Sequence, residues 1–363
     1  MTTYTSTYAL PSPGLADAPN APAQFAALTA ATETALNTVR DSTGVNNLLI
    51  NSRFEVDQRE ASPATVTGAS TGWISDRWKC TSGTGATNVL TRTAISTGSF
   101  AGAPRYKMAW NRSVAGSSTS YVHQRIEDVR NGAGKSVTVA FNAAVSSGTS
   151  DITVSLTQCF GTGGSPSSDV TTVGATTITV TTSTSTRHTV TISCPSISGK
   201  TIGSNEDSYL EVRINRASAT GTGTVDLWEP QCVIGSTAPT YVARNPQQEL
   251  ALCQRYYYQY GPFGGSRYTS VGWCYSSTVL YAIFRFPVSM RTSPTVTFSA
   301  ANDFTATNST AAYNSTGMAG SHVTPDQCLI TCTVASGLTA TQAAMFSNEQ
   351  DTTNAAIYVD AEL

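Results

Sequence analysis

Charged residues are scarce in this sequence: Asp, Glu, Lys and Arg make up 12% of 363 residues, about half the usual share. The formal net charge is −2, and without a basic stripe there is no electrostatic basis for nucleic acid or an anionic membrane as the main partner. No apolar run approaches the roughly 20 residues needed to span a bilayer. The opening MTTYTSTYALPSPG has neither the basic nor the apolar region of a secretory signal. We therefore expect a protein made in a cytoplasm that binds no nucleic acid and does not insert into a membrane.

Groups suited to catalysis are also few. The three histidines, His123, His188 and His322, lie in different segments without metal-binding spacing. Glu206 and Asp207 adjoin in a turn-like stretch, whereas a glycosidase needs two carboxyl groups facing each other across a cleft. We expect no catalytic residues and no enzymatic activity.

The eight cysteines are spread widely along the chain, without the dense pattern of a small disulfide scaffold or the spacing of a zinc site. We interpret them as buried thiols that act as small apolar residues.

What is abundant is Ser, Thr, Gly and Ala, a composition that favours strands and the turns between them. The fold class that we predict is mainly β, with an N-terminal extended arm and short helix, a β-sandwich of jelly-roll type and a second β-sandwich-like domain. The predicted strands are 47–54, 136–145, 151–160, 176–181, 188–193, 209–217 and 223–234 in the first β-domain, and 268–274, 278–286, 295–300, 328–335 and 355–362 in the second. The corresponding domains are 1–45, 46–246 and 247–363.

Residues 1–45 combine an arm and a helix. Prolines at positions 11, 13, 19 and 22 rule out a helix or a central strand there. From position 23 to position 39 an apolar stripe follows a spacing of 3 and 4, which predicts a helix. Its residues are Phe25, Leu28, Thr32, Ala35 and Val39. A helix of this length is marginal alone, so we expect it to pack on copies of itself or on a partner; a helix that lies on its own domain is the alternative.

Four short motifs carry a resemblance to a known family: NLLINSR at 47–53, DRW at 76–78, CQRYY at 253–257 and DAEL at 360–363. The chain resembles tail-fibre and related fibre proteins of tailed bacteriophages. The resemblance implies a jelly roll similar to carbohydrate-binding modules, opened by an NLLxNxxF strand, and a CQRYY linker leading to a C-terminal β-domain. It also implies a homotrimer that is located in the virion and bound to other virion proteins through residues 1–45. The tyrosine-rich segment 249–260 is interpreted as a hinge.

Glycan binding is the chemistry that the residues favour, because aromatic faces stack on sugars while polar side chains bind their hydroxyls. The candidates are Trp110 and Tyr121 in the jelly roll and Trp273 and Tyr275 in the distal domain. For the distal tyrosines a subunit interface and intrachain packing remain open. Modules that resemble this jelly roll sometimes hold a structural calcium, for which Glu55 and Asp226 occupy comparable positions; no other cofactor is expected.

The function that we predict is a structural phage virion fibre that contacts polysaccharide on the host surface. Two alternatives remain: a capsid decoration or head fibre without a receptor role, and a free carbohydrate-binding protein.

Overall fold

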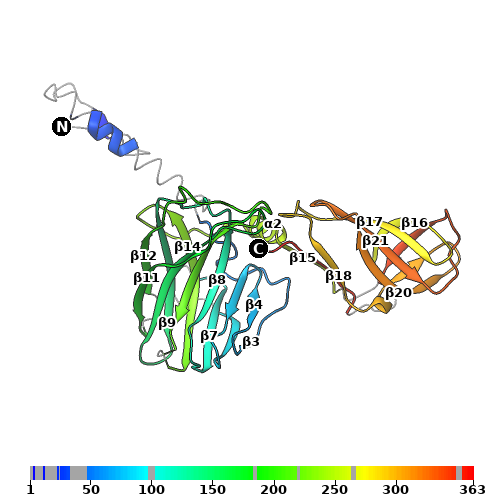
Figure 1. Ribbon diagram of the computed structural model, residues 1–363, viewed down its shortest axis with the longest axis horizontal. Helices are drawn as coiled ribbons and strands as arrows, with labels where there is room; N and C mark the ends of the chain where they lie inside the picture. Colours follow the sequence, from blue (N-terminus) through cyan, green and yellow to red (C-terminus); the bar gives the residue numbers. More distant parts are fainter. Residues whose placement is uncertain are drawn as a thin grey trace.

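The structure is a computed structural model that describes residues 3–4, 11–12, 23, 25–32, 47–96, 103–182, 186–218, 221–262, 267–348 and 354–363. Two β-domains follow one another along the long axis of the molecule, with the helix α2 (Pro246–Gln254) between them (Figure 1). The prediction of a mainly β protein with a jelly-roll sandwich is confirmed.

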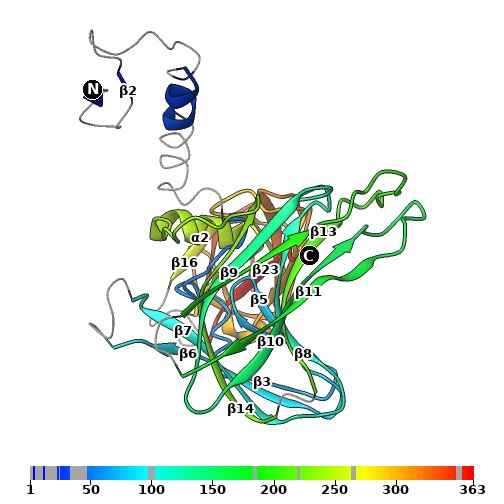
Figure 2. The same ribbon diagram turned by 90° about the vertical axis from the view of Figure 1, so that its left-hand side faces the viewer.

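The first domain consists of two six-stranded antiparallel sheets. The first sheet has the order β11 (Val170–Val180), β10 (Ser150–Cys159), β13 (Tyr209–Arg216), β8 (Ser120–Glu127), β5 (Trp78–Thr81) and β4 (Thr71–Ser75). The second has the order β12 (Thr186–Ser193), β9 (Ser136–Val145), β14 (Gly223–Ile234), β7 (Tyr106–Val114), β6 (Thr87–Ala94) and β3 (Ala64–Thr67). Figure 2 views this sandwich from its free end, with the second domain behind it.

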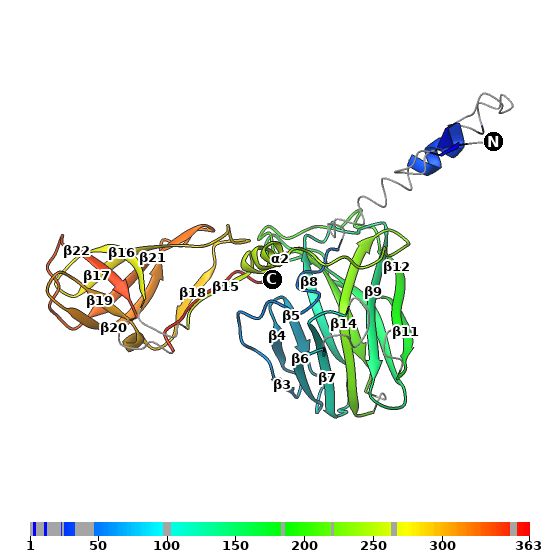
Figure 3. The same cartoon turned by 180° about the vertical axis from the view of Figure 1, so that it is seen from behind.

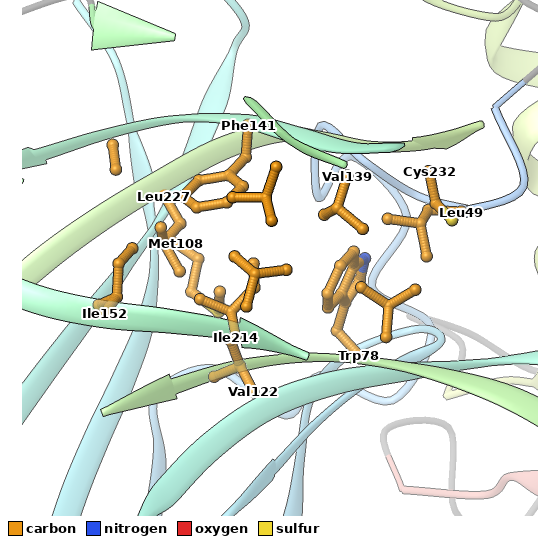
Figure 4. Packing of buried hydrophobic residues seen from close by; sticks show 14 of the residues in the cluster. Leu49, Trp78, Met108, Val122, Val139, Phe141, Ile152, Ile214, Leu227 and Cys232 are labelled. Carbon is orange, nitrogen blue, oxygen red and sulfur yellow. The ribbon is translucent and has the colours of Figure 1, made fainter. Parts of the chain in front are cut away.

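The core of the sandwich forms between the inner faces of the two sheets. In β9 the side chains of Val137, Val139 and Phe141 alternate toward it, as the two-residue period of a strand requires. Trp78 and Leu227 approach from opposite sheets (Figure 4). Each large apolar side chain buried in this way contributes about 1.5–3 kcal/mol.

The strand predicted at 47–54 is wrong, although its residues are buried as expected. Asn51 and Phe54 have φ angles of 56° and 53°, in the left-handed region, so an extended backbone cannot run through them. Asn47 fixes the segment instead: its Oδ1 accepts from the amides of Leu49 and Cys232 at 3.0 and 2.9 Å. The motif is an irregular segment anchored to β14.

The second domain adds a closed barrel to the predicted β content. The barrel order is β16 (Tyr268–Cys274), β17 (Val279–Arg285), β21 (Gln327–Val334), β20 (Ala312–Ser321), β19 (Thr305–Thr307) and β22 (Ala343–Ser347). A three-stranded sheet has the order β15 (Tyr257–Tyr260), β23 (Ile357–Asp360) and β18 (Thr295–Phe298). Figures 1 and 3 place this sheet between the barrel and the sandwich. One apolar core joins sheet and barrel.

In the N-terminal region the structure describes two paired two-residue strands, β1 (Thr3–Tyr4) and β2 (Pro11–Ser12), and helical residues at 23 and 25–32. Phe25 is 68% exposed and Leu28 is 39% exposed, and Thr32 is also exposed. The other two residues of the predicted stripe, Ala35 and Val39, lie outside the described residues. Among the described helices, none has the length and apolar character to cross a membrane.

The segment interpreted as a hinge is a buried joint. Asn245 caps the start of α2 by accepting from the Gln247 amide at 2.9 Å. At the other end of α2, Arg255 makes two bonds of 2.9 and 3.0 Å to Glu127 of the sandwich. Tyr256 is 5% exposed and lies under the Arg77 guanidinium, 3.4 Å from its ring centre. These cross-domain bonds oppose the free rotation that a hinge would need.

The last residues of the chain complete this joint from the other side. Arg59 of the sandwich pairs with Asp360 and Glu362 at 3.3 and 3.4 Å, and Arg77 pairs with Glu362 as well. Arg125 donates to the main-chain oxygen of Leu363 at 2.6 Å. The NLLINSR motif joins in through the Asn51 amide, which donates to Glu249. All four motifs that carry the family resemblance therefore meet at the junction of the two domains.

Candidate functional site

The outer face of the barrel carries an exposed group of aromatic side chains. Trp273 is 43% exposed, Tyr275 is 63% exposed, and Tyr281 is half-buried between them. The ring centroids of Trp273 and Tyr281 are 5.7 Å apart and those of Tyr275 and Tyr281 are 4.9 Å apart. We call these three side chains the aromatic platform.

Strand register explains why these rings face outward. Trp273 of β16 pairs with Tyr281 of β17, so both side chains lie on the same face of the barrel wall. Their neighbours Cys274, Leu280 and Ala282 are fully buried in the barrel. Because side chains alternate across a strand, filling the interior with these small and apolar residues places the large rings outside.

Hydroxyl groups and an apolar row border the platform. Thr331 of β21 pairs with Tyr281 on the same face, and Ser276 and Thr278 lie in the turn after Tyr275. Along the strands the platform continues into an apolar row. The row consists of Val271, Ile283 and Met345, which are 69%, 46% and 44% exposed. A contiguous exposed apolar surface of this kind marks an interaction site.

The structure overturns the prediction for Trp110. Its side chain is fully buried in the sandwich core, and its ring nitrogen donates to Asn88 at 2.8 Å. The register that pairs Trp110 with Leu90 and Val225 turns it inward. A buried ring has no face to offer a sugar, so Trp110 is a core residue.

Tyr121 lies on the outer face of the sandwich, where its ring is already occupied. The Arg213 guanidinium lies 4.5 Å from its centre, and His123 meets it edge-on at 5.2 Å. Arg213 and His123 both bind Glu211, which accepts from His123 Nδ1 at 3.0 Å and from Arg125 Nε at 2.9 Å. Tyr121 thus belongs to a bonded polar layer and lies apart from the platform.

Glu211 is the charged centre of this layer. Burial would raise the pKa of Glu211, but the hydrogen bond from His123, together with the neighbouring Arg213 and Arg125, brings that pKa well below its usual range. Burial lowers the pKa of His123, so the neutral ring donates to a carboxylate. With both oxygens of Glu211 occupied by protein donors, the layer stabilises the sandwich.

The predicted calcium pair is replaced by an ion pair. The carboxylate of Asp226 lies 2.5 Å from the Lys107 ammonium, which occupies the place a cation would take. Among the described residues Glu55 makes no contact with Asp226, and that part of the chain contains no cluster of three or more His, Cys, Asp or Glu that could hold a metal. The eight cysteines are free, and seven of them are buried, as predicted.

Sequence reasoning identified Trp273 and Tyr275 but did not single out Tyr281, the ring that connects them. The hairpin pattern in the sequence could have predicted it. Two strands joined by the turn SST at 276–278 place Trp273 opposite Tyr281.

Comparisons with known proteins found similarity to solved structures but no match to a protein family or a curated protein. Among solved structures it is similar to the CBM22-1 xylan-binding domain of Paenibacillus barcinonensis Xyn10C, with 14% identity over 53% of this chain and 97% of that chain and a TM-score of 0.31. It is also similar to a family 11 carbohydrate-binding module from Clostridium thermocellum, with 12% identity over 47% and 98% of the two chains and a TM-score of 0.30.

A third similar structure is the enzymatically active domain of tailspike protein 4 of bacteriophage CBA120. The identity is 12% over 53% of this chain, and the TM-score is 0.30. This chain covers 22% of the tailspike chain. At such identities and TM-scores the likenesses carry no argument about activity.

Proposed function

We propose that this chain is a fibre protein of a bacteriophage virion that binds cell-surface glycans without cleaving them. Residues 1–45 attach it to other virion proteins, and the aromatic platform of the distal domain contacts the glycan. The observation that carries the binding function is the exposure of Trp273 and Tyr275 around the shared ring of Tyr281.

The platform has the chemistry that sugar recognition requires. An exposed ring offers an apolar face to the C–H side of a sugar. The hydroxyls of Thr331 and Ser276 can both donate and accept hydrogen bonds at its border. Such binding needs no perturbed acid or base, which is consistent with a protein that holds its ligand unchanged.

Affinity would come from several copies acting together. One sugar on one platform is expected to bind near millimolar, about −4 kcal/mol. A homotrimer presents three platforms. Once one platform has bound, the other two meet the glycan at a high effective concentration, so the overall affinity rises. The apolar side chains of Phe25 and Leu28, exposed on the N-terminal helix, are consistent with packing against another copy or a virion protein.

A glycan array probed with the intact protein tests the binding function, and analysis of soluble products in the same preparation tests the absence of cleavage. We expect specific array signals and no released oligosaccharide. The variant Trp273→Ala/Tyr275→Ala should lose the signal. Tyr268→Ala is the matched control, because this tyrosine is on the same strand and 61% exposed but lies outside the platform. Released oligosaccharide would show an enzyme, and an array without signal would remove the receptor role.

The virion role requires a separate test. Immunogold electron microscopy of particles should locate the full chain on the virion. A chain that lacks residues 1–45 should fold but be absent from particles. Normal incorporation of that shortened chain would contradict attachment through this region.

A further inference from the structure

A polar cleft lies between the two domains, away from the platform. Its volume is about 640 Å³, within the range of ligand sites in proteins. The sandwich contributes Arg59 and Glu60, and the distal domain contributes the remaining wall. That wall is built on the outer face of the three-stranded sheet, where Gln259 of β15 pairs with Tyr358 of β23.

The cleft contains a buried carboxylate without a partner. Asp303, at the end of the 3-10 helix η1 (Ala301–Asp303), lines the cleft and is only 6% exposed. Among the described residues, no donor and no cation is paired with its side chain. Carboxylates of residues this deeply buried are normally paired or hydrogen-bonded by the protein. The carboxylate of Asp303 instead lines the open cleft, where a ligand that supplies hydrogen-bond donors can reach it.

Donors and a ring face lie on the same wall. Burial raises the pKa of Tyr257 to about 12, so its hydroxyl keeps its proton and donates to Gln259 Oε1 at 3.1 Å. Gln259 therefore has its Nε2 group available as a donor. Next to it, the half-buried Tyr358 offers a hydroxyl and a ring.

The opposite wall is fixed in place by charge and stacking. The Arg59 guanidinium lies 3.5 Å from the ring centre of Tyr257 and 3.8 Å from that of Trp73. Its ion pairs with Asp360 and Glu362 hold it there. The cleft is thus shaped before any ligand arrives, which lowers the entropic cost of binding.

We propose that this cleft is a saccharide subsite in which Asp303 accepts hydrogen bonds from sugar hydroxyls, Gln259 donates to them and Tyr358 contacts the ring. A neutral sugar fits better than an anion, because the free group is itself an anion. It also fits better than a cation, because Asp303 is a single carboxylate and Gln259 lines the same cleft with an amide group that can donate. The inference rests on the proposed function, glycan binding, and adds a site that is independent of the platform.

Saturation-transfer difference NMR with the full chain tests this site, using the methyl glycosides of glucose, galactose, mannose and N-acetylglucosamine as probes. We expect at least one probe to give a signal that survives in Trp273→Ala/Tyr275→Ala. The same signal should weaken about tenfold in Asp303→Asn and in Tyr358→Ala. Asp326→Asn is the matched control, because Asp326 is an exposed carboxylate of the same domain outside the cleft.

The outcomes separate this site from the proposed function. Signals that persist in both cleft variants, or that vanish only in the platform variant, overturn the cleft while glycan binding stands. No signal from any probe, with array binding intact, also overturns the cleft alone, whereas an array without signal removes glycan binding itself. Circular dichroism of each variant establishes that a lost signal reflects the site and not unfolding.

Discussion

Arg77 and Glu362, which are 285 positions apart, form an ion pair in the joint between the two domains. Their side chains are 2% and 7% exposed, and Arg77 also lies over the ring of Tyr256. The motifs DRW, CQRYY and DAEL therefore encode one contact, which fixes the distal domain on the sandwich. This contact opposes bending between the two domains.

Arg77→Ala should loosen the joint. Removing one partner of a buried pair leaves the other charge uncompensated and costs about 3–5 kcal/mol. We expect denaturant unfolding to separate into two transitions and small-angle scattering to show a broader range of domain orientations. Arg130→Ala is the control, because its pair with Asp128 is exposed and should contribute little. A single unshifted transition in Arg77→Ala would falsify the structural role of the pair.

Asp76 should give the stability of the protein an unusual pH dependence. Burial raises its pKa from 3.8 to about 6, so the folded state binds this proton more tightly than the unfolded state. The contribution is fully present below pH 3.8 and is lost as the pH rises through about 6, a difference of about 3 kcal/mol. Asp76→Asn should remove this contribution. Urea titrations between pH 4 and pH 7 should then show that the free energy of unfolding depends less on pH in the variant than in the wild type. The same pH dependence in both proteins would contradict the prediction.

Trp110 and Trp273 should respond in opposite ways to truncation. Trp110→Ala empties part of the sandwich core and should cost about 3–5 kcal/mol of unfolding free energy. Trp273→Ala removes an exposed ring and should change stability by about 0.5 kcal/mol or less. Chemical denaturation of both variants checks the assignment, and a strongly destabilised Trp273→Ala would mean that this ring packs within the fold.

Gly272→Ala should disturb the wall beneath the platform. A Cβ at this position would lie 1.9 Å from the main-chain oxygen of Tyr281, so β16 and β17 would have to separate, at about 1–3 kcal/mol or more. Gly317→Ala in the same barrel is the control, because its nearest neighbour would be at an ordinary 3.7 Å. In thermal unfolding, the melting temperature should fall for Gly272→Ala but not for Gly317→Ala. Equal melting temperatures would contradict the close approach of β16 and β17 at this position.

Several strands could be predicted from the sequence because apolar residues recur at every second position, as Val137, Val139 and Phe141 do in β9. The predicted bounds 136–145, 223–234 and 268–274 agree with β9, β14 and β16. By contrast, β8 was not predicted. Its inward-facing Gln124 lies between the core residues Val122 and Ile126, so the apolar alternation that reveals a strand in a sequence is broken.

The site was predictable only in part, because exposure depends on register between distant strands. Trp110 stands among polar residues in AWNR, like a surface aromatic. Its burial follows from pairing with Val225, more than a hundred positions away. Trp273 pairs with Tyr281 of the next strand along the chain, so the face on which it lies is set by a local hairpin and could be predicted. Asp303 and Tyr358 come together only through the arrangement of the distal domain, which no local pattern signals.

The most direct test of glycan binding through the platform is an equilibrium titration of the intact protein with the strongest glycan from the array. Light scattering on the same samples would report the mass. We predict that Trp273→Ala/Tyr275→Ala weakens binding about tenfold or more, since each ring contact is worth about 0.5–1.5 kcal/mol, and leaves the mass unchanged. Unchanged affinity, or weaker binding accompanied by a smaller mass, would contradict the account and make this face of the barrel a contact between copies of the chain.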